Sequence, residues 1–198
     1  MSVDLGAVYD KHAGRWDRAR NRTLVEGASL NAASELAPPP GKVLDLGCGS
    51  AEPIARYFID QGYVLTGVDL ADGMLELCRR RFPSMTWLRR DMRGLELGER
   101  FDIVVAWDSF FHLGCDDQRA MLETFQRHTA PGGVLLFTSG DEESEGAGGD
   151  MFGDQLYHGS LTTEEYRERL EGLGFAVVQH RVNDPACLRT MWLLQLVV

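Results

Sequence analysis

Residues 43–52, VLDLGCGSAE, run a short apolar strand into an acidic residue, a glycine-containing turn and the first residues of a helix. In an open α/β sheet such a turn lies at the carboxyl end of a strand, where a ligand-binding crevice forms and where glycine lets the backbone approach a ligand closely. The stretch therefore predicts a doubly wound α/β fold with a small-molecule cofactor at this turn.

The spacing of small residues indicates the kind of cofactor. A dinucleotide fingerprint, G-x-G-x-x-G, starting at Gly47 would place glycine at position 52, where this chain has Glu52. A carboxylate in the first helical turn also competes for the positive helix end that would otherwise bind a pyrophosphate. A second apolar run, residues 64–69, ends in Asp69, which is placed to accept hydrogen bonds from ribose hydroxyls. We therefore expect a cofactor that contains a nucleoside and no phosphate.

Five segments, taken in order, resemble the class I S-adenosylmethionine-dependent methyltransferases. The glycine turn is similar to their motif I, and Asp69 is similar to their ribose-binding acid. Residues 90–92 resemble the segment that contacts adenine, residues 101–107 the fourth strand, and residues 131–133 the turn before the fifth strand. The resemblance implies S-adenosylmethionine as the cofactor and S-adenosylhomocysteine as its product. It leaves the methyl acceptor open.

Strand-like and helical segments alternate along the chain. After a leading amphipathic segment and a second helix through about Leu36, we expect helices near residues 51–61, 72–81, 116–128 and 162–173, and strands near residues 43–46, 64–69, 85–89, 101–107, 133–139, 175–180 and 190–198. Such alternation implies right-handed crossovers and a parallel sheet covered on both faces. The last two strands are separated by nine residues, too few for a helical crossover, and should pair antiparallel. The expected fold is Rossmann-like: a doubly wound seven-stranded sheet, mostly parallel with the last strand antiparallel.

Composition favours one domain. With 198 residues and 44% hydrophobic content, the chain can bury a single core. We divide the expected domain, residues 1–198, into a helical cap (1–40), a cofactor-binding core (41–139) and an acceptor-side part (140–198). No apolar run approaches the ~20 residues that cross a bilayer, and the amino terminus does not resemble a secretory signal, so a cytoplasmic location is expected. The four cysteines lack the spacing of a zinc site or a disulfide framework, so we expect reduced thiols and no metal.

The formal net charge of -10 bears on partners. It repels polyanions but not a cationic sulfonium, so we expect a small-molecule methyl acceptor and neither nucleic acid nor membrane as a partner. Six arginines between residues 79 and 93 are interpreted as a helix end and a solvated loop rather than a nucleic-acid-binding patch. Residues 108–110, after the fourth strand, lack the N-P-P-Y signature of transfer to exocyclic base or glutamine amides. The sequence does not predict the oligomeric state.

Residues 140–150, GDEESEGAGGD, are rich in glycine and acids. Low hydrophobicity and like charges disfavour packing, so we expect a mobile loop. Because it follows the fifth strand at the carboxyl side of the sheet, the loop has two interpretations, an active-site lid and a surface connection.

Candidate bases lie beyond the fourth and fifth strands. They are His112, His158 and Asp108, each with a structural alternative: packing for the histidines, helix capping or loop ordering for Asp108. The residues expected to bind the cofactor are Tyr9, Trp16, Asp45, Gly47, Cys48, Gly49, Asp69, Leu70, Met74, Asp91, Met92 and Trp107. Asp45 is expected to anchor the α-amino end of the cofactor through the turn. The resemblance places the two methionines at the adenine edge, with filling of core gaps as the alternative. It places the two aromatic residues of the leading segment over the methionine end, with packing on the sheet as the alternative.

Three functions stay open on the sequence alone. The first is methyl transfer from S-adenosylmethionine to an oxygen, nitrogen or carbon atom of a small molecule. The second is a nicotinamide-dependent oxidoreductase, disfavoured by Glu52 and by the antiparallel final strand pair, and the third is a catalytically silent cofactor-binding or partner-binding protein. Binding of S-adenosylmethionine against NAD separates the first two, and turnover separates the first from the third.

Overall fold

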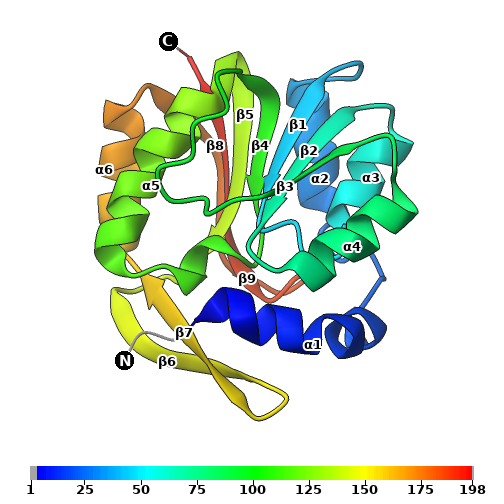
Figure 1. Ribbon diagram of the computed structural model, residues 1–198. Coiled ribbons are helices and arrows are strands. Elements are labelled where there is room, and N and C mark those ends of the chain that lie inside the picture. Colours follow the sequence, from blue (N-terminus) through cyan, green and yellow to red (C-terminus); the bar gives the residue numbers. More distant parts are fainter. Residues whose placement is uncertain (1–3, 198) are drawn as a thin grey trace.

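The apolar runs of the sequence form a seven-stranded sheet with helices on both faces in the computed structural model, which describes residues 4–197 (Figure 1). The strands of this sheet are β1 (Lys42–Leu46), β2 (Val64–Asp69), β3 (Thr86–Arg89), β4 (Phe101–Ala106), β5 (Thr129–Ser139), β8 (Phe175–Asp184) and β9 (Arg189–Leu196). The helices are α1 (Leu5–Ala19), α2 (Gly27–Leu36), α3 (Ile54–Asp60), α4 (Asp72–Arg81), α5 (Cys115–His128), α6 (Thr163–Gly172) and the short 3-10 helix η1 (Phe110–His112). Residues 1–3 of the expected helical cap and Val198 of the expected last strand lie outside the described residues.

The order of the strands confirms the expected reversal at the end of the chain. The sheet runs β3-β2-β1-β4-β5-β9-β8, in which β1 to β5 are parallel and β9 is antiparallel to both of its neighbours. The final strand therefore inserts between β5 and β8 instead of extending the edge. Strand β8 continues to Asp184, farther than the sequence indicates, so that only residues 185–188 connect it to β9.

Two hydrophobic clusters cover the two faces of the sheet. One contains Val43 of β1 with residues from α2, α3 and α4, and the other contains Leu44 of β1 with residues from α5 and α6. Neighbouring residues of one strand thus enter opposite clusters, as the pleat requires. With both faces covered by helices, the ends of the parallel strands are the places where loops can build a site.

Helix α3 begins three residues later than the sequence predicts. Ala51 has a φ of +65°, a left-handed conformation that an α-helix cannot include, and the helix begins only after Pro53. Glycine is the residue that adopts such a φ most readily.

The prediction of a mobile loop at residues 140–150 is wrong for most of this segment. Residues Ser144–Met151 form strand β6, which pairs antiparallel with β7 (Asp154–Ser160) as a separate two-stranded sheet. Backbone hydrogen bonds to β7 order this segment, and they need no apolar side chain on β6. A shift of register at Gly148 accommodates the His158 ring, which lies 2.1 Å from where a Cβ would stand. The hairpin lies beside α1 at one end of the large sheet (Figure 1).

Candidate active site

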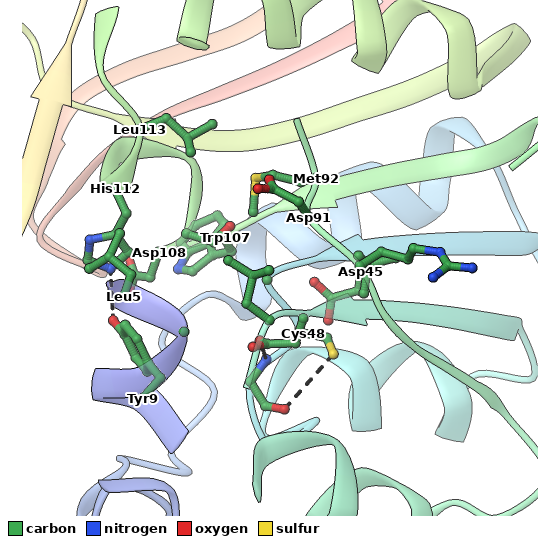
Figure 2. A pocket seen from close by; sticks show the side chains of 18 of the residues that line it. Leu5, Tyr9, Asp45, Cys48, Asp91, Met92, Trp107, Asp108, His112 and Leu113 are labelled. Atoms are coloured by element: carbon green, nitrogen blue, oxygen red, sulfur yellow. Dashed lines mark hydrogen bonds between the residues drawn. The ribbon is translucent and has the colours of Figure 1, made fainter. Parts of the chain in front are cut away.

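A cavity of 840 Å³ opens at the carboxyl ends of β1, β2 and β4, beneath α1 (Figure 2). Its volume lies within the range of small-molecule sites. All of the sequence-predicted site residues except Met74 and His158 line it. Residues that the sequence analysis did not select also line it, among them Arg20, Arg93, Ser109 and Tyr157.

The glycine turn forms part of the cavity wall. Gly47 and Gly49 have φ of +76° and +51°, in the left-handed region that favours glycine. A Cβ on Gly47 would lie 2.3 Å from the Cβ of Ser109, whose hydroxyl donates to the Leu46 carbonyl at 2.6 Å. The turn is therefore fixed between β1 and the segment after β4, with no room for a side chain.

Asp69 ties the glycine turn to the end of β2. Its Oδ2 accepts a hydrogen bond from the Gly49 amide at 2.9 Å, and its Oδ1 accepts one from the Ala71 amide at 2.9 Å. Burial raises the pKa of Asp69. Each carboxylate oxygen can accept a further hydrogen bond, so the side chain can order the turn and contact a ligand at the same time.

Asp45 is a buried carboxyl in the cavity wall, with 4% of its surface exposed. Burial, followed by the negative charge of Asp69, raises the pKa of Asp45 to about 7, and the Arg20 guanidinium acts in the opposite direction. A cationic group of a ligand would favour the ionised form. Cys48 lies nearby, and burial raises the pKa of its thiol well above the usual value. All four cysteines are free.

Arg20 is the main residue that the sequence analysis missed. It follows the last residue of α1, and its guanidinium lies 3.4 Å from Glu26 Oε1 and 3.6 Å from Asp108 Oδ2. Its Nε is buried without a hydrogen-bond partner among the described residues. A guanidinium in a cavity wall is suited to an anionic ligand group. Its position four residues after Trp16, on the same helical face, is the signal that could have identified it.

His112 occupies the opposite side of the cavity. Its Nδ1 lies 3.0 Å from the Tyr157 carbonyl oxygen, which can only accept, so Nδ1 carries the proton. Nε2 is then the acceptor, and the Tyr9 hydroxyl donates to it at 2.8 Å (Figure 2). Burial lowers the pKa of His112 and raises that of Tyr9, so both groups are neutral near pH 7. The ring presents a basic nitrogen in a fixed tautomer.

The other two candidate bases are placed differently. Asp108 has a φ of +50°, and its carboxylate contacts the Arg189 guanidinium at 2.5 and 3.2 Å. This bidentate pairing joins the loop after β4 to the start of β9. His158 lies outside the cavity lining, with its ring 5.0 Å from that of His112 and 4.8 Å from that of Phe111. Burial lowers the pKa of His158 to about 4.

Met74 also lies outside the cavity lining. Its side chain is fully buried with Ala13 and Ala71, where α1 packs on α4. Met92, the other methionine expected at the adenine edge, does line the cavity. The adenine-side prediction for Met74 thus has no cavity contact to support it.

Charged groups around the cavity are mostly acidic. The lining includes seven acids (Asp4, Asp45, Glu52, Asp69, Asp91, Asp108 and Asp117) and three arginines (Arg20, Arg90 and Arg93). Arg93 contacts Asp91 at 2.6 Å and Asp117 at 3.0 Å. The remaining arginines of the group between residues 79 and 93 have separate partners where contacts exist: Arg81 pairs with Asp17, Arg89 pairs with Asp72, and Arg79 and Arg80 donate to backbone carbonyls.

Within residues 4–197, no helix is both long and apolar enough to cross a membrane. The same residues contain no group of three or more histidine, cysteine, aspartate or glutamate side chains arranged as a metal site.

Comparisons with known proteins agree with this geometry. The family described as a methyltransferase domain matches residues 43–133. A dTDP-4-amino-2,3,4,6-tetradeoxy-D-glucose N,N-dimethyltransferase from Saccharopolyspora spinosa is 26% identical over 95% of this chain and 76% of its own length. A dTDP-3-amino-3,6-dideoxy-alpha-D-glucopyranose N,N-dimethyltransferase from Streptomyces fradiae is 34% identical over 68% of this chain, which spans about half of that relative.

A solved structure shares the fold. The S-adenosylmethionine-bound amino pentose methyltransferase CalS10 from Micromonospora echinaspora aligns with 94% of this chain and 96% of its own, with a TM-score of 0.72 and 20% identity. These similarities favour a methyltransferase over the nicotinamide-dependent oxidoreductase that the sequence left open. Joined to the glycine turn, the acid at the end of β2 and the reversed last strand, they show that the chain belongs to the class I S-adenosylmethionine-dependent methyltransferases.

Proposed function

We propose that this enzyme transfers a methyl group from S-adenosylmethionine to the nitrogen of a small, uncharged or cationic amine, with His112 as the proton acceptor. The observation that carries the proposal is the fixed tautomer of His112, which presents a neutral Nε2 at the cavity. Two relatives are named as N,N-dimethyltransferases of amino sugars, which supports nitrogen as the acceptor atom.

The polar and apolar groups of the cavity suit the chemistry of the cofactor. Asp69 binds the ribose hydroxyls, and Asp91, Met92 and Leu70 border the adenine. At the methionine end, Asp45 and the glycine turn face the α-ammonium group, and the Arg20 guanidinium faces the carboxylate. Trp16, Trp107, Tyr9 and Cys48 complete this wall. The two left-handed glycines let the turn pack closely against Ser109 and Trp16 in the cavity wall.

S-adenosylmethionine supplies a methyl group that its sulfonium already activates. The protein therefore needs chiefly to align the acceptor with the donor and to exclude water. An amine must lose a proton in the course of methylation, and His112 Nε2 is placed to accept it. The Nδ1–H bond to the Tyr157 carbonyl stabilises the resulting imidazolium. The Tyr9 hydroxyl occupies Nε2 until the acceptor replaces it.

The charge around the cavity supports the class of acceptor. Seven acids face three arginines, and two of these arginines already pair with acids. Such a lining attracts a protonated amine and opposes a polyanion. Leu5 and Leu113 supply the apolar part of the lining near His112.

Turnover on a panel of small molecules tests the proposal. The panel contains free amines, matched alcohols and nucleotide-linked amino sugars, each incubated with S-adenosylmethionine and analysed by mass spectrometry. We expect a methyl group on the nitrogen of a free amine, with stoichiometric S-adenosylhomocysteine. Methylation confined to alcohols or carbon, or to the nucleotide-linked sugars, would contradict the proposed acceptor.

A further inference from the structure

The tip of the β6–β7 hairpin contacts α1 through an ion pair. Asp154, the first residue of β7, accepts hydrogen bonds through Oδ2 from Lys11 Nζ and from His12 Nε2, both at 2.6 Å. More than 140 residues of sequence separate the two sides of this contact. It joins α1 to the hairpin, two separate elements that each supply side chains to the cavity lining.

The turn between β6 and β7 has a strained backbone and also contacts α1. Phe152 and Gly153 connect β6 to β7 with φ of +56° and +103°, the combination of a two-residue type I′ hairpin turn, for which asparagine and glycine are the favoured residues. A left-handed conformation is costly for a bulky side chain. The Phe152 ring packs against α1, with the Arg15 guanidinium 4.0 Å from its centroid and the His12 ring 5.4 Å away. The packing of the Phe152 ring on α1 offsets the cost of its left-handed backbone conformation.

The opposite flank of α1 is fixed to α4. Asp17 binds the Arg81 guanidinium at 2.6 and 2.8 Å, and Asp10 accepts from the Gly73 amide at 2.6 Å. These residues lie seven apart and share one helical face, whereas the hairpin contacts fall on another. Tyr9 and Trp16, again seven apart, occupy the face between them and line the cavity. The contacts with α4 on one side and with the hairpin on the other therefore fix the rotation of α1 about its own axis.

We propose that Asp154 and Phe152 are positioning residues, which hold α1 in the rotation that directs the Tyr9 hydroxyl to His112 and closes the acceptor half of the cavity. The hairpin then controls both hydrogen bonds of His112: Nδ1 bonds to the Tyr157 carbonyl of β7 itself, and Nε2 is reached through α1. The inference rests on the proposed role of His112, and it adds that the hairpin and α1 together position the two hydrogen-bond partners of this residue.

The experiment compares three variants with the wild-type chain: Asp154→Ala, Phe152→Gly and the control Glu142→Ala, which removes the same charge from an exposed position before β6. Hydrogen exchange of residues 5–19 and the ¹⁵N resonances of His112 are recorded with and without S-adenosylhomocysteine. We expect exchange of α1 to accelerate by about tenfold in the first two variants, because a lateral contact is lost, and to stay unchanged in the control. The His112 Nε2 resonance should move only in the first two.

Two further readouts separate positioning from general destabilisation. Phe152→Gly removes the backbone strain of the turn, so we expect the hairpin amides to exchange no faster while α1 exchanges faster. Affinity for S-adenosylhomocysteine should stay within about twofold, because the α4 side of α1 is untouched. Asp154→Glu should restore the His112 resonance.

Unchanged exchange of α1 in both variants, or an unmoved His112 resonance, would overturn the inference. A parallel loss of S-adenosylhomocysteine affinity would overturn it as well, since α1 would then have melted as a whole. Failure of wild-type protein to bind S-adenosylhomocysteine would instead contradict the proposed function, and the measurements without ligand would still decide the role of the hairpin.

Discussion

Asp45 is the residue whose ionisation should respond most directly to the cofactor. Burial and the neighbouring Asp69 raise its pKa to about 7, so that it is largely protonated at pH 6. A cofactor ammonium beside it favours the carboxylate, and binding at pH 6 should release up to one proton. At pH 8.5, where the carboxylate is already ionised, release should be close to zero. Calorimetry in buffers of different ionisation enthalpy measures the number of protons released on binding.

The same pKa has a consequence for stability. A carboxyl whose pKa is higher in the folded chain than in the unfolded chain contributes stability that is fully present below the unfolded value of 3.8 and is lost as pH rises through about 7. The variant Asp45→Asn should therefore lack both the proton release and this component of the pH dependence. Equal proton release by the variant and the wild type would assign the titration to another group.

Gly47 tests whether the turn excludes a side chain by contact or by conformation. A Cβ at this position meets Ser109 at 2.3 Å, whereas a Cβ on Gly62, which also has a positive φ, meets nothing within 4 Å. Gly62→Ala thus carries only the conformational cost, about 1–2 kcal/mol. Gly47→Ala should lower the free energy of unfolding by more than this and abolish cofactor binding. If denaturant unfolding and calorimetry gave the two variants equal stability and equal affinity, Ser109 would not be the obstacle.

His112 and His158 form a matched pair for the catalytic assignment, because their rings are 5.0 Å apart and only the former lines the cavity. Loss of a general base lowers kcat by about 10²–10⁴-fold, which we expect for His112→Ala. His158→Ala should lower kcat by less than about tenfold. Since burial lowers the pKa of His112 from 6.5, the acid limb of the wild-type kcat profile should lie below pH 6.5. Equal losses in the two variants would remove His112 from its proposed role.

At the scale of elements, the alternating core was predictable and the hairpin was not. Strand β2 and helix α4 match the expected bounds, because an apolar run and an amphipathic run are each bounded by acids or turn residues. Strand β6 carries almost no buried side chain, so no hydrophobic pattern marks it, and its order comes from pairing with β7. Helix α3 starts late because the conformation of Ala51 depends on the packed turn and not on local propensity.

Some residues of the candidate site could be predicted from the sequence, and others could not. Asp45, Gly47, Gly49 and Asp69 could be found because they follow strands, whose carboxyl ends must meet at one edge of the sheet. Arg20 and Tyr157 come from a helix end and a separate hairpin, and only tertiary packing brings them to the cavity. Met74 packs with Ala13 and Ala71 and does not line the cavity, and the sequence does not distinguish a buried methionine of α4 from a cavity-lining one.

Helix α1 allows a test at this scale, through its attachment to α4. Arg81 lowers the pKa of Asp17 to about 2, so the pair contributes stability above the ordinary pKa of 3.8, and this contribution is lost as pH falls towards 2. Asp17→Ala should lower the free energy of unfolding by about 1–3 kcal/mol. It should also weaken S-adenosylhomocysteine binding, because Trp16 and Arg20 adjoin this contact, and thereby differ from Asp154→Ala. Thermal unfolding and calorimetry measure both effects, and unchanged cofactor affinity would contradict the proposed link between α4 and the cofactor side.

For the molecule as a whole, the net negative charge and the acidic cavity lining act together. The chain carries a net charge of -10, and acids also predominate in the cavity lining. Long-range attraction and local pairing therefore both favour the ligands that we propose, a sulfonium cofactor and an amine, and both disfavour polyanions. The fold brings the two kinds of lining together: residues at the ends of β1 and β2 form one part of the cavity wall, and residues of α1 and the hairpin form another.

We expect the cavity at the carboxyl ends of β1, β2 and β4 to bind S-adenosylmethionine through Asp69 and the glycine turn. Titration calorimetry of S-adenosylmethionine into the wild-type chain and into Asp69→Ala tests it most directly. We predict one site in the wild type and a loss of ~1–3 kcal/mol in the variant, roughly 5–150-fold in affinity, because the turn and the ribose hydroxyls lose their shared acceptor. Unchanged affinity in Asp69→Ala would show that the cofactor binds elsewhere and would contradict the assignment.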